Sequence, residues 1–365
     1  MIAVNLTAVG IELVGGTTRY AVSLFEAMVK LAATKCDRLR IVGYVQAGAE
    51  HHFSVQAQCH IVPLPRLPSR TVRALYVQTI LPYLLRRQQV SVLINPVFTG
   101  PVFAVQTVVT ILHDLYFHTI PQLVEPRRRN FLKLMVPRMV RASTAVIAIS
   151  EHTAREARTL WPKATAKIHT VHSAGRELPN AAPLRRGEPF VLFVGAVLPH
   201  KNVDCIIASL SQLQAHGTNV RCLHIGADPQ DLLAASVRKH DASQYVESIG
   251  SADDALLASA YKGALALVVA SYTEGFCLPI LEAQGLGVPV CATRRGAIPE
   301  VAGNSALYFD PDNPAELARH IKQLLDSSEQ AADMAIAGKS NAARFSWERT
   351  AAGVLEHALA AGVSA

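Results

Sequence analysis

The chain has 365 residues, of which 50% are hydrophobic and 17% charged, so a disordered protein is excluded and two globular domains of ordinary size are expected. A net charge of +7 favours an anionic partner, without choosing among a nucleotide, a membrane surface and a nucleic acid. No apolar run has the length of a membrane-spanning helix, no signal peptide is recognised, and six scattered cysteines without a C-x-x-C pair indicate reduced thiols in a reducing compartment.

Strand-like apolar runs alternate with helix-like stretches along the whole chain. In the first half these runs are Ile2–Val9, Arg40–Val45, Val90–Ile94, Val105–Leu112 and Thr144–Ile149. In the second half they are Phe190–Val194, Arg221–Ile225, Tyr245–Ile249, Ala266–Ala270 and Pro289–Thr293. Continuous apolar strands between helices predict parallel sheets covered on both faces. Two such series predict an α/β fold of two doubly wound, Rossmann-like domains.

The boundary between the domains is expected in residues 173–189, SAGRELPNAAPLRRGEP, which are rich in proline, alanine and charge and lack periodicity. We therefore predict an N-terminal domain of residues 1–175 and a C-terminal domain of residues 176–345. Residues 346–365 are predicted to form a closing helix that can pack back toward the N-terminal domain.

Two features of the first half follow predicted strands. The stretch GGTTRYA begins with Gly15 and Gly16, which could let backbone amides approach a phosphate or a sugar, although a plain turn also fits. It is not a P-loop, since no G-K-[ST] follows. His113 and Asp114 come directly after Val105–Leu112. A structural histidine and a histidine that hydrogen-bonds a bound sugar both fit this position.

The stretch 126–141, PRRRNFLKLMVPRMVR, is basic and amphipathic. Leu132, Met135, Val136 and Met139 share one helical face. A core-packed helix with a solvated basic side and a contact with an anionic membrane both fit. Nucleic acid is not expected as a partner, because no zinc-finger or RNA-binding signature is present and few aromatic residues are interleaved.

In the second half, FVLFVGAVLPHKN (190–202) places Gly195 at a turn and Lys201 in a short loop after a strand. A lysine at the carboxyl end of a strand can neutralise a diphosphate. The pair Asp310 and Asp312 could suggest a metal site, but it precedes a proline and an acid at a helix start, and we interpret it as a turn and a cap.

The stretch SYTEGFCLPILEAQG (271–285) follows an apolar strand and carries two acids, Glu274 and Glu282, with seven residues between them. Pro279 suits the first turn of a helix. Amides at such a helix start are expected to be free to bind an anion, namely those of Phe276, Cys277 and Leu278. Acids here could merely offset the helix dipole, or form a glycosidase pair. Because both belong to one strand–helix turn, we expect them to bind neighbouring hydroxyls of one ligand.

This stretch resembles the E-x(7)-E signature of retaining glycosyltransferases of family 4 (group 1), and among them the mannosyltransferases. The segments GLGVPVCATRRGAIPEVAG (285–303), FVLFVGAVLPHKN (190–202) and FSWERTA (345–351) also resemble that family, so the similarity covers most of residues 190–351. The N-terminal half matches more weakly. The resemblance implies the GT-B fold, in which two Rossmann-like doubly wound domains face each other across a cleft, with the nucleotide sugar held mainly by the second.

The resemblance also implies roles for single residues. The catalytic set is His113, Lys201 and Glu274. Glu274 would contact hydroxyls of the donor sugar, Glu282 the ribose, and Lys201 the departing diphosphate. The full donor-binding set is Gly15, Gly16, Gly195, Lys201, Glu274, Gly275, Phe276, Cys277, Leu278 and Glu282. Many relatives carry an arginine directly after the glycine of the phosphate loop, where this chain has Ala196. A second cation then has to come from Arg19, His200 or Arg294.

The activity so implied is transfer of a hexose with retention, without a metal or a cofactor. The leaving phosphate itself would accept the proton of the acceptor in a front-face mechanism. The expected donor is GDP-mannose, with UDP- and dTDP-sugars as alternatives. The acceptor is a glycan or a lipid-linked saccharide of a cell-surface polysaccharide such as lipopolysaccharide, assembled at the inner face of the cytoplasmic membrane. Alternatives of another class are a sugar-nucleotide epimerase and a non-catalytic nucleotide-binding protein.

Overall fold

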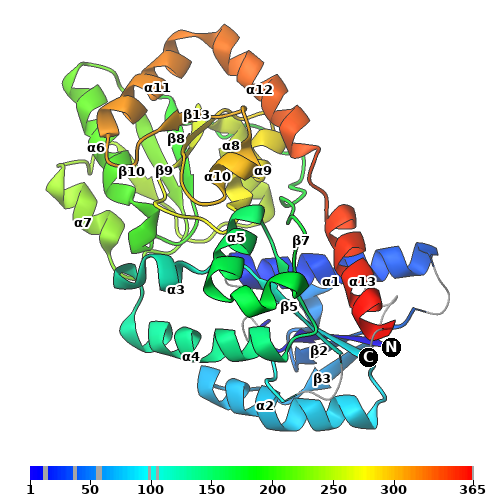
Figure 1. Cartoon of the computed structure of the whole chain (residues 1–365). Coiled ribbons are helices and arrows are strands. Elements are labelled where there is room, and N and C mark those ends of the chain that lie inside the picture. Colours follow the sequence, from blue (N-terminus) through cyan, green and yellow to red (C-terminus); the bar gives the residue numbers. More distant parts are fainter. Residues whose placement is uncertain (11–14, 36–38, 55–59, 98–99, 104–106, 364–365) are drawn as a thin grey trace. The chain divides into compact units, whose positions relative to one another are not determined.

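The computed structural model describes residues 1–10, 15–35, 39–54, 60–97, 100–103 and 107–363. The chain divides into two compact units (Figure 1). The first unit comprises Met1–Ser173 together with Ser346–Ala365, and the second comprises Ala174–Phe345. Each unit is an α/β structure with one parallel sheet of its own.

The first unit is built on a seven-stranded parallel sheet in the order β3-β2-β1-β4-β5-β6-β7. Its strands are β1 (Ile2–Leu6), β2 (Ile41–Gln46), β3 (His60–Leu64), β4 (Val92–Asn95), β5 (Thr107–Leu112), β6 (Ala145–Ala148) and β7 (Ile168–Thr170). Every residue of the five inner strands is buried, as expected for a sheet covered by helices on both faces.

The helices of the first unit include one from the far end of the chain. They are α1 (Gly16–Lys35), α2 (Arg70–Arg87), α3 (Tyr116–Thr119), α4 (Pro126–Ala142), α5 (Glu151–Leu160) and α13 (Trp347–Val363). Helix α13 returns to this unit and packs on α1 (Figure 1), with Val354 and Ala358 fully buried. The hydroxyl of Thr350 donates a hydrogen bond to the carbonyl oxygen of His172 at 2.8 Å, which ties its first turn to the end of the sheet.

The second unit is built on a six-stranded parallel sheet in the order β10-β9-β8-β11-β12-β13. Its strands are β8 (Phe190–Val194), β9 (Arg221–Ile225), β10 (Val246–Ser248), β11 (Ala266–Val269), β12 (Val290–Thr293) and β13 (Leu307–Phe309). Its helices are α6 (Val203–Ala215), α7 (Leu232–Lys239), α8 (Asp254–Gly263), α9 (Leu278–Gly285), α10 (Ile298–Ala302), α11 (Pro314–Asp326) and α12 (Ser328–Ala342).

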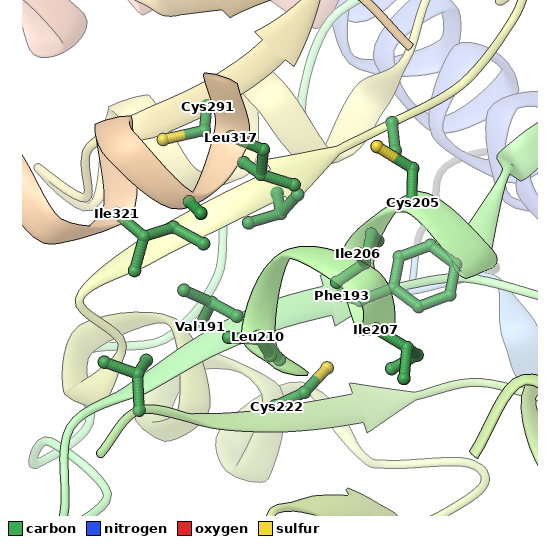
Figure 2. Packing of buried hydrophobic residues seen from close by; sticks show 14 of the residues in the cluster. Val191, Phe193, Cys205, Ile206, Ile207, Leu210, Cys222, Cys291, Leu317 and Ile321 are labelled. Carbon is green, nitrogen blue, oxygen red and sulfur yellow. The ribbon is translucent and has the colours of Figure 1, made fainter. Parts of the chain in front are cut away.

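The core of the second unit lies between its sheet and helices α6 and α11. Figure 2 shows side chains of strand β8 and of both helices meeting there, with the thiols of Cys205, Cys222 and Cys291 among them. Within the described part of the chain the cysteines are buried free thiols, while Cys36 and Cys59 lie outside it. Burial raises the pKa of Cys222 and Cys291 to about 12, so both thiols pack as neutral, apolar groups.

Each of the ten predicted strands overlaps a strand of the structure, and the first two residues of Val105–Leu112 lie outside the described residues. Three strands were not predicted from the sequence, namely β3, β7 and β13. All three lie at an edge of a sheet. Two of them have only three residues, and β3 has a single buried residue and contains Pro63, which argues against a strand.

Candidate functional site

The candidate site of the second unit lies where the strand order of its sheet reverses. Strands β8 and β11 are neighbours, and from them the chain proceeds outward in opposite directions, to β9 and β10 on one side and to β12 and β13 on the other. In open parallel sheets the loops after two such strands flank a crevice in which ligands bind. These loops carry Lys201 and Glu274.

An ion pair joins the two loops across this switch point. The ammonium of Lys201 lies 2.5 Å from Oε1 of Glu274, and the hydroxyl of Ser271 donates to the same oxygen at 2.7 Å. The two charged side chains are 18% and 11% exposed, so the pair is accessible from one side. Burial works to raise the pKa of Glu274, but the charges of Lys201 and His200 and the hydrogen bonds outweigh it and hold that pKa below its ordinary value. Glu274 is therefore an ionised acceptor at neutral pH.

The backbone around Glu274 is held from two directions. The N–H of Tyr272 donates to the carbonyl oxygen of His200 at 2.8 Å, which ties the loop after β11 to the loop after β8. The N–H of Ala297 donates to the carbonyl oxygen of Glu274 at 2.9 Å. Gly296 has a positive φ of 60°, and a Cβ there would lie 2.5 Å from the Glu274 nitrogen. Only glycine fits so close an approach, so the stretch TRRGA fixes the position of the acid.

Helix α9 begins immediately after this loop. Its first residue is Leu278, and Pro279 occupies the first turn, as the sequence predicts. Cys277 precedes the helix in a left-handed conformation, with φ 75°. In the part of the chain that the structure describes, no hydrogen bond engages the N–H groups of Cys277 and Leu278. These amides and the positive end of the helix dipole can together bind an anion.

Glu282 lies one turn into α9 and has quite different surroundings. Its side chain is only 2% exposed. Arg176 donates through Nε to Oε1 at 2.7 Å and through Nη2 to Oε2 at 3.4 Å, and the hydroxyl of Tyr261 donates to Oε2 at 2.8 Å. Glu274 and Glu282, which the sequence predicts as a pair on one ligand, thus have separate networks in this structure.

The other predicted residues of the second unit have partners of their own. Gly195 directly follows β8 and has a positive φ of 115°, and its carbonyl oxygen lies 2.9 Å from Nε2 of the buried His224. Among the candidates for a second cation, His200 is buried and its charge acts on Glu274. The guanidinium of Arg294 instead stacks on the ring of Tyr308, 4.0 Å from its centroid. Arg19 belongs to the first unit.

In the first unit, His113 follows β5 and is buried. Its Nε2 lies 2.6 Å from the carbonyl oxygen of Pro96, and the ring of Tyr20 packs edge-on at 4.7 Å between centroids. Burial lowers the pKa of His113 to about 4, although the hydrogen bond to Pro96 acts in the opposite sense. The imidazole is neutral at pH 7, and because Nε2 faces a carbonyl it carries the proton, which leaves Nδ1 as an acceptor.

Helix α1 begins at Gly16, directly after Gly15. Gly15 has a positive φ of 88°, both residues are exposed, and a Cβ on either would meet nothing within 4 Å. Residues 11–14 before them lie outside the described part of the chain.

The Asp-x-Asp stretch serves as a turn and a cap, as the sequence predicts. The side chain of Asn313 accepts from the N–H of Glu316 at 3.3 Å, and Pro314 begins α11. The carboxylate of Asp310 accepts from the N–H of Asp312, and Asp312 accepts from the hydroxyl of Tyr272. Among the described residues, no group of three or more His, Cys, Asp and Glu side chains is arranged to hold a metal ion.

Sequence reasoning missed Arg176, Tyr261 and Ser271. Arg176 lies in a stretch that the sequence marks only as a domain boundary, and Tyr261 only as one aromatic residue of a helix. Ser271 stands three residues before Glu274 at the end of a strand, where a hydroxyl beside an acid could have been suspected.

The two parallel Rossmann-like sheets give the chain the GT-B fold predicted from the sequence. Residues 176–341 match the family model described as "Glycosyl transferases group 1", so the second unit is a group 1 glycosyltransferase domain. In fold, the whole chain is similar to a sucrose-phosphate synthase from Thermosynechococcus elongatus, with a TM-score of 0.80 and 20% identity over 100% of this chain and 99% of that one.

Two curated relatives match parts of the chain. It is 25% identical to "O-antigen chain mannosyltransferase B" of Escherichia coli over 271 residues, which cover 69% of this chain and 71% of that protein. It is 32% identical to a "D-inositol 3-phosphate glycosyltransferase" of Segniliparus rotundus over 176 residues, or 46% of this chain, and spans only 39% of the length of that relative. No helix within the described residues combines the length and apolarity needed to cross a membrane.

Proposed function

We propose that the protein is a retaining glycosyltransferase that binds a nucleotide sugar at the switch point of its second sheet. The ion pair between Lys201 and Glu274 carries this proposal. It places a cation and an ionised acceptor beside the amides that begin α9, within the segment that matches the glycosyltransferase family model. A nucleotide sugar needs these three groups, because it offers a diphosphate next to sugar hydroxyls.

In the bound state Lys201 would hold the diphosphate. An ammonium has three N–H donors, so it can keep its bond to Glu274 while donating to a phosphate oxygen. The amides of Cys277 and Leu278 would bind the diphosphate from the helix side, with Gly275 and Phe276 next to the sugar. Glu274 would accept from sugar hydroxyls, and its bond to Ser271 leaves its second oxygen for them.

Catalysis would then consist of stabilising the leaving diphosphate as the glycosidic bond breaks. Lys201 and the helix amides carry the charge that develops on the phosphate oxygens. The phosphate would take the proton of the attacking acceptor hydroxyl on the same face of the sugar, so that configuration is retained without a protein nucleophile. His113, whose imidazole is neutral at pH 7, is proposed to hydrogen-bond the transferred sugar.

GDP-mannose is the proposed donor, and the name of the mannosyltransferase relative favours it over the alternatives. Thermal melts of the protein in the presence of GDP-, UDP- and dTDP-sugars test this choice. A ligand that binds the folded state alone raises the melting temperature in proportion to its occupancy. We expect GDP-mannose to give the largest rise. A larger rise in melting temperature with a UDP- or dTDP-sugar would mean that this sugar nucleotide, and not GDP-mannose, is the donor.

The acceptor is proposed to be a lipid-linked saccharide at an anionic membrane. Of the predicted apolar face of α4, Leu132, Val136 and Met139 are buried and Met135 is half-buried. Phe131 and Leu134, however, remain 43% and 52% exposed on the same basic helix. On α2, which precedes β4 as α4 precedes β6, further apolar side chains are exposed: Val72, Leu75, Ile80 and Tyr83.

Vesicle sedimentation tests this membrane contact. Exposed apolar side chains among arginines and lysines should bind anionic more than zwitterionic vesicles. Replacing both Phe131 and Leu134 by serine should weaken binding to phosphatidylglycerol vesicles. Ile336→Ser provides the control, because Ile336 is 71% exposed on α12 of the other unit and should not matter. If the wild type, the double variant and Ile336→Ser bind the vesicles equally, α4 does not contact the membrane.

An epimerase of the same fold and a non-catalytic nucleotide-binding protein are the rivals. Incubating the protein with its donor distinguishes them, because an epimerase converts the sugar without an acceptor and a non-catalytic protein leaves it unchanged. We expect transfer, or slow donor hydrolysis, that is lost in Glu274→Gln and Lys201→Ala while both variants stay folded. Full activity in both would refute the proposed site.

A further inference from the structure

Arg176 reaches Glu282 from outside the helices and strands. It lies three residues after the division between the two units, in a stretch without regular structure. The approach is close, because a Cβ on Gly175 would lie 2.9 Å from Cβ of Leu281 and 3.3 Å from the nitrogen of Glu282. Glycine therefore lets the stretch run directly against α9, and the guanidinium of the next residue reaches the acid.

The guanidinium divides its donors between two acids of unequal burial. Nε and Nη2 face the carboxylate of Glu282, whose side chain is 2% exposed. Nη1 lies 2.8 Å from Asp254, whose side chain is 49% exposed. The contact with Glu282 is the one that fixes the orientation of the two side chains, because water screens a buried ion pair only weakly. The exposed contact with Asp254 is screened by water and does not fix its partners.

The network leaves Glu282 with capacity for a further ligand. A carboxylate can accept about four hydrogen bonds, and three donors occupy it here: two from Arg176 and one from Tyr261. Tyr261 is itself fully buried, so its hydroxyl approaches from the interior of the unit. The carboxylate is thus held by fixed donors, and its remaining acceptor site has one orientation. A hydroxyl that bonds there would meet a side chain that Arg176 and Tyr261 already hold in place.

We propose that Arg176 is a positioning residue that, together with Tyr261, aims Glu282 at the ribose hydroxyls of the donor nucleotide. This inference rests on the proposed function, since it assumes that a nucleotide binds beside α9. It makes the irregular stretch at the start of the second unit part of donor recognition.

Calorimetric titration with two pairs of nucleotides tests the proposal. GDP is compared with 2′,3′-dideoxy-GDP, and UDP with 2′,3′-dideoxy-UDP. If Glu282 binds the ribose hydroxyls, the wild-type protein should prefer the ribonucleotide by about tenfold, as expected for one lost charge-assisted hydrogen-bonding contact. Arg176→Gln should lose this preference by weakening ribonucleotide binding alone, with the affinity for the dideoxynucleotide unchanged. A merely structural role would weaken both nucleotides equally.

Asp254→Asn is the matched control, because it breaks the exposed ion pair of Arg176 and leaves the inner one. It should keep the wild-type preference. If Arg176→Gln does not fold, Arg176→Lys decides by the same ratio, since lysine keeps the charge but cannot donate two parallel bonds. Tyr261→Phe should lower the preference by a smaller factor.

The outcomes separate this inference from the proposed function. A protein that binds none of the four nucleotides, and does not bind dTDP either, would refute both. A ribose preference that survives in Arg176→Gln, or in Arg176→Lys if only that variant folds, would refute the role of Arg176 and leave the glycosyltransferase proposal standing. Equal binding of ribo- and dideoxynucleotides by the wild-type protein would show that Glu282 does not hold the ribose, and would refute the inference alone.

Discussion

The loop after β11 and the helix that follows it treat two identical acids in opposite ways. Glu274 pairs with a lysine, which is a compact charge on a flexible stem, and both partners remain accessible. Glu282 pairs with an arginine, whose planar fork fixes the carboxylate, and a buried tyrosine completes its surroundings. The first pair can exchange partners when a ligand arrives. The second cannot do so without leaving a buried charge.

The two surroundings suit two different tasks of Glu274 and Glu282, which lie close together in the sequence. An acid that meets the reacting sugar has to be ionised and reachable, which the pairing with Lys201 provides. An acid that recognises a constant part of the donor has to be rigid, which Arg176 provides. The two networks are therefore expected to differ in rigidity and in role.

The largest effect on stability is expected at Arg176. Arg176→Met removes one partner of the buried pair and leaves the charge of Glu282 uncompensated, which should lower the free energy of unfolding by about 3 kcal/mol. Asp254→Asn should cost less than about 1 kcal/mol, because it affects only the exposed pair. Urea unfolding followed by circular dichroism measures both. Equal costs would mean that the inner pair is no more important than the outer one.

The largest effect on activity is expected at Lys201. Lys201→Ala removes a cation from the leaving diphosphate and should lower kcat about a hundredfold. Lys239→Ala is the control, because Lys239 forms an exposed ion pair with Asp204 in the same unit, 2.7 Å away, and its loss should leave kcat unchanged. Sugar transfer at saturating donor is the measurement. A similar kcat for both variants would contradict the role of Lys201.

A smaller effect is expected from the tyrosine that completes the Glu282 network. Tyr261→Phe removes one hydrogen bond to a buried carboxylate and should cost about 1.5 kcal/mol of unfolding free energy. Tyr272→Phe, which removes a hydrogen bond to the more exposed Asp312, should cost less. Thermal melts of the two variants side by side give the comparison, and a reversed order would be inconsistent with a rigid Glu282.

The smallest effect is expected on the thermal stability of the protein at low pH. The pKa of Glu274 lies below its ordinary value of 4.5 in the folded protein, against the opposing effect of burial, because Lys201 and His200 favour the ionised form. The ion pair therefore stabilises the folded protein fully when the pH is above the ordinary pKa of the glutamate. This stabilisation is lost as the pH falls through the lowered pKa of Glu274. The difference in melting temperature between wild type and Lys201→Ala should be constant near neutral pH and shrink in acid. A difference that does not change with pH would contradict the pairing.

The sequence predicts the inner strands of both sheets well, because strands such as Ala266–Val269 are buried on both faces and appear as unbroken apolar runs. The edge strands β3, β7 and β13 escape it, since an exposed or very short strand needs no such run. The same reasoning applies to the site. Lys201 and Glu274 follow inner strands and could be placed at the sheet edge, whereas the contact of Arg176 with Glu282 joins residues 106 positions apart and depends on packing that no local pattern records.

Calorimetric titration of GDP into the wild-type protein, Lys201→Ala and Lys239→Ala tests the central claim most directly, with UDP and dTDP as parallel ligands. The account predicts that one nucleotide diphosphate binds the wild-type protein and Lys239→Ala equally. It predicts about tenfold weaker binding to Lys201→Ala, as expected for the loss of one charge-assisted contact to phosphate. Equal affinity of all three proteins, or binding of none of the nucleotides, would contradict it.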